Sequence, residues 1–466
     1  MAAIETQSVE QVDKVSLRVL VDKERNRVLY AEAGKDFVDV LFSFLTLPLG
    51  TIARLVSKDS NIEAVKFGSI SSLYQSVSKF DQQYLWSHTC KEMLLNPRNS
   101  MEDYCQKLKL NIDDTSMQYF VCENWDCRRK NSGCRLSIFR NKICYCGKVM
   151  NREVFPEYPN LENGFVKKNV TFIISDDLYV MPNVFEVVDL LKLSLTSKAA
   201  LTSFILKKNR FVVNPSRRNN LEFLIGELPS DEDRQISVKV TVQKSDEQIL
   251  FVEAGDDFVD FVYSFLTFPL GRVLHMLQGF SSLSCIDNLY KSLCDLSPDI
   301  YLMSQGLKDK LTKPLIATQF ELIKQLLPIG VATLPVNYCH TYYDHVSGKC
   351  VLNFTKEADY THDKVGFPEK FVPLELADHD PSIAKSSFVK GPSTYMVTDS
   401  LFVSLMSSIS TMLFLKRSKV RLSDLEERVI KIGVKEGLSI LKASLTSTSA
   451  LQCGLKKFIK TVKVEK

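Results

Sequence analysis

The sequence has no apolar run long enough to cross a membrane and no excess of charge of one sign. A spanning helix needs about 18 or more consecutive apolar residues, whereas the two most apolar stretches, 37–50 and 401–415, are shorter and contain polar residues. We therefore predict that both stretches are buried elements of a folded domain and that no membrane is a partner. The net charge of +4, from 59 basic and 55 acidic residues, provides no general attraction to a polyanion.

Targeting signals and common catalytic motifs are also missing. Residues 1–14 have no apolar core and no arginine, so they resemble neither a secretory signal nor a transit peptide. The expected location is the cytosol or the nucleus, where clustered cysteines are metal ligands more often than disulfides. The sequence contains no Walker loop, dinucleotide fingerprint, G-x-S-x-G or H-E-x-x-H motif, and its six histidines are scattered, which disfavours a histidine-based triad.

The chain is an internal duplication. Three blocks of its first half recur in the same order in its second half: 28–56 at 249–277, 165–176 at 388–399, and 190–201 at 440–451. In the first pair, 15 of 29 positions are identical. We predict two homologous domains, 13–225 and 234–466, joined by a polar linker at 226–233. The offset between the copies grows by 27 residues before the third block, which predicts an extra insertion at about 404–430 of the second copy. Within it, Ser423 to Glu426 form a capping-box pattern that predicts a helix.

Each copy begins with the same predicted elements. Residues 15–21 alternate between apolar and more polar side chains, the period of a half-buried strand, and 28–31 form a second strand. Apolar residues within 37–45 then recur at helical spacing, with Asp36 at the expected N-cap and Asp39 in the first turn. The predicted class is therefore α+β, with two strand–turn–strand–helix domains in tandem.

Three of these motifs also resemble a known family. EAGKDFVDVLFSFLTLPLG at 32–50, Cys-x-Cys-Gly at 144–147 and SLTSKAAL at 194–201 are together similar to the plant family called domain of unknown function 674. The resemblance covers nearly the whole chain and implies a plant protein, often in tandem-duplicated form. It implies no activity, so any function must be argued from the residues themselves.

A cluster of cysteines is the strongest chemical signal. Five of the twelve cysteines fall within 25 residues: Cys122, Cys127, Cys134, Cys144 and Cys146. Structural zinc is held by four thiolates that arrive as two short pairs, and Cys122-x4-Cys127 with Cys144-x-Cys146 would supply them, with Cys134 as a spare thiol or a substitute for Cys122. We predict a structural Zn²⁺ in a small Cys-rich β-ribbon, at about 119–152, inserted in the first domain. The alternative is a loop of free thiols. The second copy has only Cys339 and Cys350 in the corresponding region and is predicted to have lost the module.

The same segment is basic. Residues 122–152 have eight basic and two acidic side chains, and aromatic residues lie among them and just before them, as nucleic-acid binding needs. Nucleic acid could be bound through Arg128, Arg129, Lys130, Arg135 and Arg140. The alternative is a solvated ribbon whose aromatic rings pack against its own domain.

Repeated carboxylates offer a third possibility. Six acidic residues recur in the two copies: Glu32, Asp36, Asp39, Glu253, Asp257 and Asp260. Such groups could do acid–base chemistry or hold Mg²⁺, although helix capping also accounts for the aspartates. The sequence therefore favours a non-enzymatic interaction or scaffold protein with a structural zinc ribbon and an unidentified protein partner. Nucleic-acid binding is the alternative, and an enzyme comes third.

Overall fold

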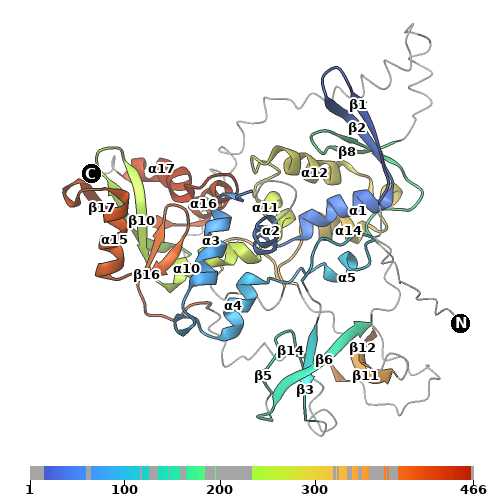
Figure 1. The fold of residues 1–466 in the computed structure, drawn as a ribbon, viewed down its shortest axis with the longest axis horizontal. Helices are drawn as coiled ribbons and strands as arrows, with labels where there is room; N and C mark the ends of the chain where they lie inside the picture. The colour runs from blue at the N-terminus through green and yellow to red at the C-terminus, as the bar shows by residue number, and fades with distance from the viewer. Residues whose placement is uncertain are drawn as a thin grey trace, which may run out of the picture.

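The two copies are built from the same order of strands and helices (Figure 1). The computed structural model describes residues 15–58, 65–115, 118–124, 135–144, 146–157, 164–183, 195, 234–317, 322, 325–332, 338–344, 349–355, 372–373, 375–376 and 387–462. The predicted linker at 226–233 and two of the candidate ligands, Cys127 and Cys134, lie outside these ranges. No helix within them is both long and apolar enough to cross a membrane.

The first repeat contributes two sets of strands with helices between them. Its elements are β1 (Leu17–Asp22), β2 (Arg27–Ala33), α1 (Lys35–Ser43), η1 (Phe44–Thr46), α2 (Leu49–Val56), α3 (Gly68–Lys79), η2 (Gln82–Tyr84), α4 (His88–Leu95), α5 (Glu102–Cys105), β3 (Tyr119–Cys122), β4 (Arg135–Ser137), β5 (Lys142–Ile143), β6 (Val149–Glu157), β7 (Phe172–Ser175) and β8 (Val180–Pro182).

The second repeat follows the same plan as far as β16, and its described part continues to residue 462. Its elements are β9 (Ile236–Gln243), β10 (Gln248–Ala254), α10 (Asp256–Ser264), η4 (Phe265–Thr267), α11 (Leu270–Met276), α12 (Ser284–Asp295), α13 (Pro298–Tyr301), α14 (Gln305–Thr312), β11 (Tyr338–Asp344), β12 (Lys349–Thr355), β13 (Val372–Pro373), β14 (Glu375–Leu376), β15 (Tyr395–Thr398), β16 (Val403–Leu405), α15 (Ser408–Ser418), η6 (Leu422–Asp424), β17 (Leu425–Ile432), α16 (Val434–Thr446) and α17 (Ala450–Val462).

The strands within the described ranges form three sheets. The first is antiparallel, in the order β1-β2-β7-β8, and the second, also antiparallel, has the order β16-β15-β10-β9-β17. The third contains strands from both repeats, in the order β13-β11-β12-β6-β3-β4-β14, with β5 beside β6. The combination of helices with mostly antiparallel sheets confirms the predicted α+β class.

The start of each helical region differs in detail from the prediction. The helix expected over 37–45 is present as α1 and η1, and residues 37–50 are largely buried, as predicted. Asp36 is not the N-cap, because α1 begins one residue before it and Gly34 takes the cap position without a side-chain hydrogen bond. Asp39 is the fifth helical residue and therefore lies beyond the first turn.

The two repeats contact each other at the prolines that come before α2 and α11. Pro48 and Pro269 form an isolated antiparallel bridge. The backbone N–H of Leu49 donates to Phe268 O, and that of Leu270 donates to Leu47 O, both at 2.9 Å. The contacts are reciprocal, since 47 and 49 correspond to 268 and 270 in the repeat.

Helices are exchanged between the repeats. In the first repeat α3 packs on α16 of the second, where Ser69 Oγ donates to Ser447 O at 2.7 Å. Its counterpart α12 packs on β8 of the first repeat, where the Ser292 hydroxyl accepts the Val180 N–H at 2.8 Å. The described parts of both repeats therefore share one large hydrophobic core rather than two separate ones.

Two extended segments reinforce this exchange. Trp86 N donates to Phe388 O and Lys390 N to Tyr84 O, at 3.1 and 2.8 Å. Equivalent bonds join the segment around Phe165 to the second repeat: Met303 N donates to Phe165 O at 3.0 Å and Lys167 N to Tyr301 O at 2.9 Å. In each case an extended segment of one repeat forms backbone hydrogen bonds with a segment of the other.

The first strand of each repeat has a different environment. In the second repeat β9 pairs with β17 along its whole length, and Val238, Val240 and Val242 are buried. In the first repeat β1 has no described strand on its outer edge, and Leu17, Val19 and Val21 are exposed. The predicted half-buried strand therefore fits β9 but not β1.

The region predicted as an insertion, about 404–430, contains α15, η6 and most of β17. The helix predicted from Ser423 to Glu426 is wrong, because residues 425–432 extend along β9 as a strand. The prediction that 401–415 is buried is wrong in part. Leu401, Val403 and Leu415 are buried, but Ile409 and Met412 are strongly exposed.

Candidate metal centre

The cysteine cluster lies at one end of β3, beside the turn that joins β5 to β6. Cys122 is the last residue of β3 and follows a β-bulge in its pairing with β6, an irregularity that re-aims the side chain that follows it. Cys144 and Cys146 lie in the turn, where Cys144 N donates to Lys148 O and Gly147 N to Cys144 O, both at 2.8 Å. Gly147 has a φ of +79°, the left-handed backbone for which glycine is best suited.

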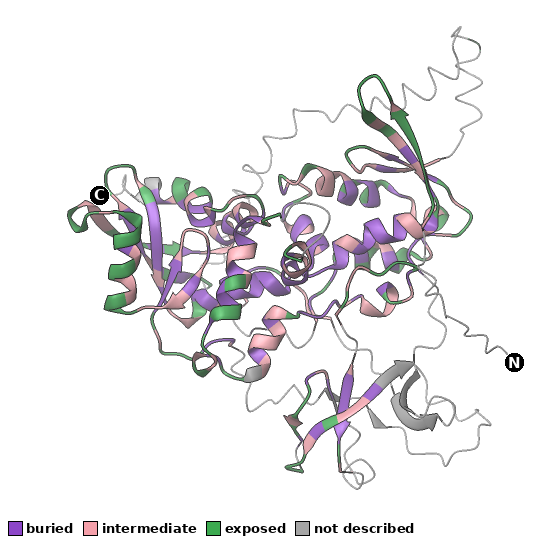
Figure 2. Ribbon diagram, in the orientation of Figure 1, coloured by how far each residue is buried: buried purple, intermediate pink, exposed green. Residues whose placement is uncertain are grey.

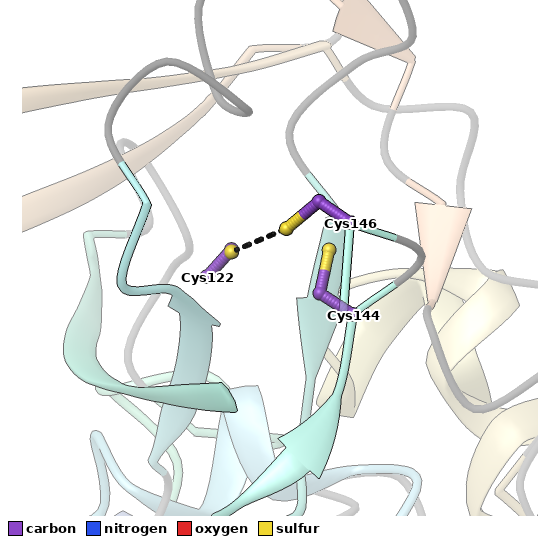
Figure 3. Close-up of side chains that lie close together, drawn as sticks. All are labelled: Cys122, Cys144 and Cys146. Atoms are coloured by element: carbon purple, nitrogen blue, oxygen red, sulfur yellow. Dashed lines mark hydrogen bonds between the residues drawn. The ribbon is translucent and has the colours of Figure 1, made fainter. Parts of the chain in front are cut away.

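The three thiols converge on one point (Figure 3). All three sulfur atoms lie within 4.8 Å of one another, and Cys122 Sγ is 3.4 Å from Cys146 Sγ. That separation is far longer than a disulfide bond and close to the roughly 3.8 Å between two sulfurs on tetrahedral zinc with Zn–S bonds of about 2.3 Å. The cluster therefore has the spacing of a metal-holding set of thiolates.

The surroundings of the cluster are apolar on one side and open on the other. Cys122 and Cys144 are buried and pack with Phe120 and Met150, whereas Cys146 is exposed. Burial, with smaller contributions from the neighbouring Cys146 and Cys144, raises the pKa of the Cys122 thiol to about 11, against the lowering effect of a backbone hydrogen bond from Asn124. Three neighbouring thiolates would repel one another, so a bound divalent cation would favour their ionised form.

The sequence predicted this convergence for Cys122, Cys144 and Cys146. The other two candidates, Cys127 and Cys134, fall on residues that the structure does not describe. The choice of fourth ligand therefore stays a prediction.

The sheet around the cysteines is not an isolated ribbon of the first repeat. Strand β12 of the second repeat pairs in parallel with β6, from Val351 opposite Phe155 to Asn353 opposite Glu157, and β14 pairs in parallel with β4. The second copy therefore has a strand pair, β11 and β12, in this sheet. Cys339 and Cys350 lie in β11 and β12, but in register with Phe354 and Tyr343 rather than with each other.

The basic side chains near the centre are only partly described. Arg140 and Lys148 are exposed, and Arg140 lies 3.7 Å from Glu153. Arg135 lies in β4, whereas 128–130 are outside the described ranges. Among the aromatic residues in and just before the basic segment, Tyr119, Phe120 and Phe139 are buried and cannot present their rings to a ligand in this conformation.

The repeated carboxylates each have a local partner. Asp39 Oδ1 accepts the backbone N–H groups of Phe165 and Val166 at 2.8 and 2.9 Å, and Lys35 Nζ lies 2.6 Å from Oδ2. The remaining contacts are Glu32 with Asn183 (3.2 Å), Asp36 with Lys109 (3.5 Å), Glu253 with Lys239 (2.9 Å), Asp257 with Phe258 N (2.8 Å) and Asp260 with Phe388 N (2.8 Å). In the described part of the chain only the three cysteines form a group of three or more that could hold a metal ion. The sequence did not identify Lys35, although its replacement by Asp256 in the second copy was visible in the repeat.

The fold and this cluster define a duplicated α+β protein with a set of thiols able to hold a metal ion. The model of the family described as "Protein of unknown function (DUF674)" matches residues 11–186 and 181–436, so the chain is a tandem-duplicated member of that family. The resemblance found in the sequence is thereby confirmed, while the plant origin it implies stays a prediction. Neither a search of curated proteins nor a search of solved structures found a significant match to the chain.

Proposed function

We propose that the protein is a non-enzymatic interaction protein whose cysteine cluster holds a structural zinc ion. The observation that supports this most directly is the convergence of three sulfur atoms, from two separate segments, within 4.8 Å. Cys127 or Cys134 would complete a tetrahedral set of four thiolates. Zinc with four protein ligands has no open coordination position and stabilises structure rather than activating water.

The position of the cluster supports a structural role. Zinc there would tie the end of β3 to the β5–β6 turn, beside strands that pair with the second repeat through β12. Such a tie would stabilise the sheet that contains strands of both repeats, because the free energy of metal binding adds to that of folding. The sheet would then offer a fixed surface for a protein partner.

Metal analysis of the purified chain tests this proposal. We expect about one zinc ion per wild-type chain, purified without added metal or chelator, and none in a Cys144→Ser/Cys146→Ser variant. A Cys294→Ser/Cys453→Ser variant is the matched control, since both of these thiols are exposed and lie outside the cluster. Absence of metal from folded wild-type protein would refute the proposal, as would zinc retained by the cluster variant.

Single substitutions then identify the fourth ligand. Cys127→Ser and Cys134→Ser are compared for zinc content after dialysis against a weak chelator. The variant that loses zinc identifies the fourth ligand. Equal retention of zinc by both variants would show that neither cysteine is that ligand.

Nucleic-acid binding is the second candidate function. It is supported by the net charge of +6 over residues 122–152 and by the exposure of Arg140 and Lys148 beside the centre. With three of the aromatic rings buried, such binding would depend mainly on phosphate contacts, so it should be strongly weakened by salt. We expect retention on immobilised RNA or DNA to fall in an Arg128→Glu/Arg129→Glu/Lys130→Glu variant. Unchanged retention in that variant would exclude this segment as the binding surface.

A further inference from the structure

Helix α15 is exposed along much of its length (Figure 2), and α15 and the turn after it contain large apolar side chains that are exposed. Ile409 is 74% exposed, Met412 65%, Leu413 51% and Leu422, in η6, 69%. Single exposed apolar residues are ordinary, but a cluster of them on one element marks an interaction surface.

The exposed residues share one face of a well-defined helix. Ile409, Met412 and Leu413 stand at positions i, i+3 and i+4, which lie on the same side of a helix. A capping box between Ser407 and Ser410 begins α15, and Lys419 in the left-handed conformation ends it. The surface is therefore fixed by local hydrogen bonds rather than by a bound partner.

The opposite face of α15 packs against the second-repeat sheet. Leu415 packs with Leu250, Phe251 and Met396 of the sheet, and Phe414 meets Phe251 edge-on with ring centroids 5.8 Å apart. These contacts attach α15 to the sheet through its buried face. The apolar face formed by Ile409, Met412 and Leu413 consequently points away from the core.

Positive charge adjoins this apolar face. Lys416, Arg417, Lys419 and Arg421 are all exposed, and the sequence from 400 to 423 contains no acidic residue. Among the described side chains none forms an ion pair with these four cations. The nearest following acid, Asp424, instead accepts hydrogen bonds from Ser245 and Gln243.

We propose that α15 and the turn through Leu422 dock on the surface of an anionic lipid bilayer. The aliphatic side chains would enter the boundary between headgroups and acyl chains, and the four cations would lie at the level of the lipid phosphates. This is attachment to one leaflet, which needs no spanning segment. It revises the prediction that no membrane is a partner, which considered spanning helices alone.

Shape and composition favour a bilayer over other partners. The helix lies at one end of the molecule, on the outer side of the second-repeat sheet (Figure 1). A protruding helix suits a broad surface better than a narrow groove. The exposed apolar residues are aliphatic, whereas single-stranded nucleic acids are held by aromatic rings on which bases stack.

Flotation with lipid vesicles tests the proposal. Full-length protein is mixed with vesicles of phosphatidylcholine alone or with phosphatidylserine at about 30 mol%, at low and high salt. We expect binding to the anionic vesicles, weakened at high salt, and little binding to the neutral ones. A Lys416→Gln/Arg417→Gln variant should bind about 25-fold more weakly, since each cation near an anionic surface contributes about fivefold.

Variants elsewhere make the test specific. Ile409→Ser/Met412→Ser/Leu413→Ser should also lose vesicle binding while keeping the wild-type circular dichroism and melting temperature, because these side chains are exposed. A Lys23→Gln/Arg25→Gln variant in the β1–β2 turn, a region that also exposes aliphatic side chains, should bind as wild type. No binding to anionic vesicles, or a loss caused only by the β1–β2 variant, would overturn the proposal and leave α15 as a contact for a protein.

Discussion

Two equivalent aspartates are expected to respond in opposite ways to replacement by asparagine. Burial raises the pKa of Asp39 against the lowering effect of Lys35, and at pH 8 the carboxyl is ionised. At that pH Asp39→Asn should lower the free energy of unfolding by about 3–5 kcal/mol, because the buried Lys35 ammonium is left without its partner. Asp260→Asn should instead raise the free energy of unfolding above pH 7. The two residues occupy the same position in the two repeats and hold the same backbone segment.

The difference arises from the residue one helical turn earlier. In the first repeat the buried Lys35 ammonium lies 2.6 Å from Asp39 and donates to Val166 O at 2.8 Å. In the second repeat Asp256 replaces it, and the Ser387 hydroxyl donates to the equivalent carbonyl of Val389 at 2.7 Å. The hydrogen bond to the carbonyl is thus conserved between the repeats, but the positive charge is lost. Burial of Asp260, together with the charge of Asp256, raises the pKa of Asp260 to about 7, against the lowering effect of its hydrogen bonds.

The sign of the pH dependence follows from this pKa. Between pH 4 and pH 7 the folded state holds a proton on Asp260 that the unfolded state has released, so stability falls as the pH rises through this range. The contribution is fully present below about pH 4 and lost above pH 7, a change of up to about 4 kcal/mol. Asparagine resembles the protonated acid and cannot ionise, so this part of the pH dependence should vanish in Asp260→Asn.

Urea unfolding at pH 5, 6, 7 and 8 measures both effects. The wild type and both single variants are compared with Lys35→Met/Asp39→Asn, which removes both charges of the buried pair and should recover most of the stability lost in Asp39→Asn. If both single variants weakened the fold equally, with parallel pH profiles, the assignment of a charged pair to one repeat and a protonated acid to the other would be wrong.

Local features of the fold were predictable because they depend on short segments. The helical spacing of residues 37–45 and the proline after them were enough to locate α1, η1 and the break before α2. The repeated blocks were enough to show two copies. The capping-box pattern at 423–426 failed because pairing with β9 along eight positions outweighed a local helical signal.

The exchange of helices could not be predicted from one copy of the repeat. Because the copies are homologous, α3 and α12 carry similar apolar faces, and either helix has two similar sheets against which to pack. The similarity of the copies predicts that such a helix packs against a repeat core, but not whether that core belongs to its own copy or to the other. The parallel pairing of β12 with β6 has the same origin, as it joins residues about 200 positions apart.

The candidate site was predictable only as a cluster. Proximity in sequence brought Cys144 and Cys146 to one turn, whereas the approach of Cys122 depends on the β3–β6 pairing. The surface of α15 was missed because an apolar stretch of this length fits either a buried or an interfacial element.

Substitution of Gly68 by alanine is expected to weaken both repeats together. Gly68 begins α3 with a φ of +47°, and a Cβ atom there would lie 2.3 Å from Ser444 O and 2.8 Å from the carbonyl carbon and oxygen of Leu445, in the other repeat. These are backbone atoms in the core and cannot move aside as a flexible side chain would. Backbone strain of about 1–2 kcal/mol and overpacking of about 1–3 kcal/mol should together lower the free energy of unfolding by about 3 kcal/mol.

The way in which the protein unfolds distinguishes exchanged helices from two independent domains. If α3 belongs to the core of the second repeat, denaturant unfolding of Gly68→Ala should remain a single transition with a lower midpoint and an unchanged slope. Gly306→Ala is the matched control, because a Cβ on Gly306 in α14 meets no atom within 4 Å and should stabilise the helix by about 0.5–1 kcal/mol. Two separate transitions, with only the one reported by probes in the first repeat displaced, would contradict the exchange. A single transition would instead mean that the duplicated halves depend on each other for their stability, so that neither repeat can be removed without unfolding the other.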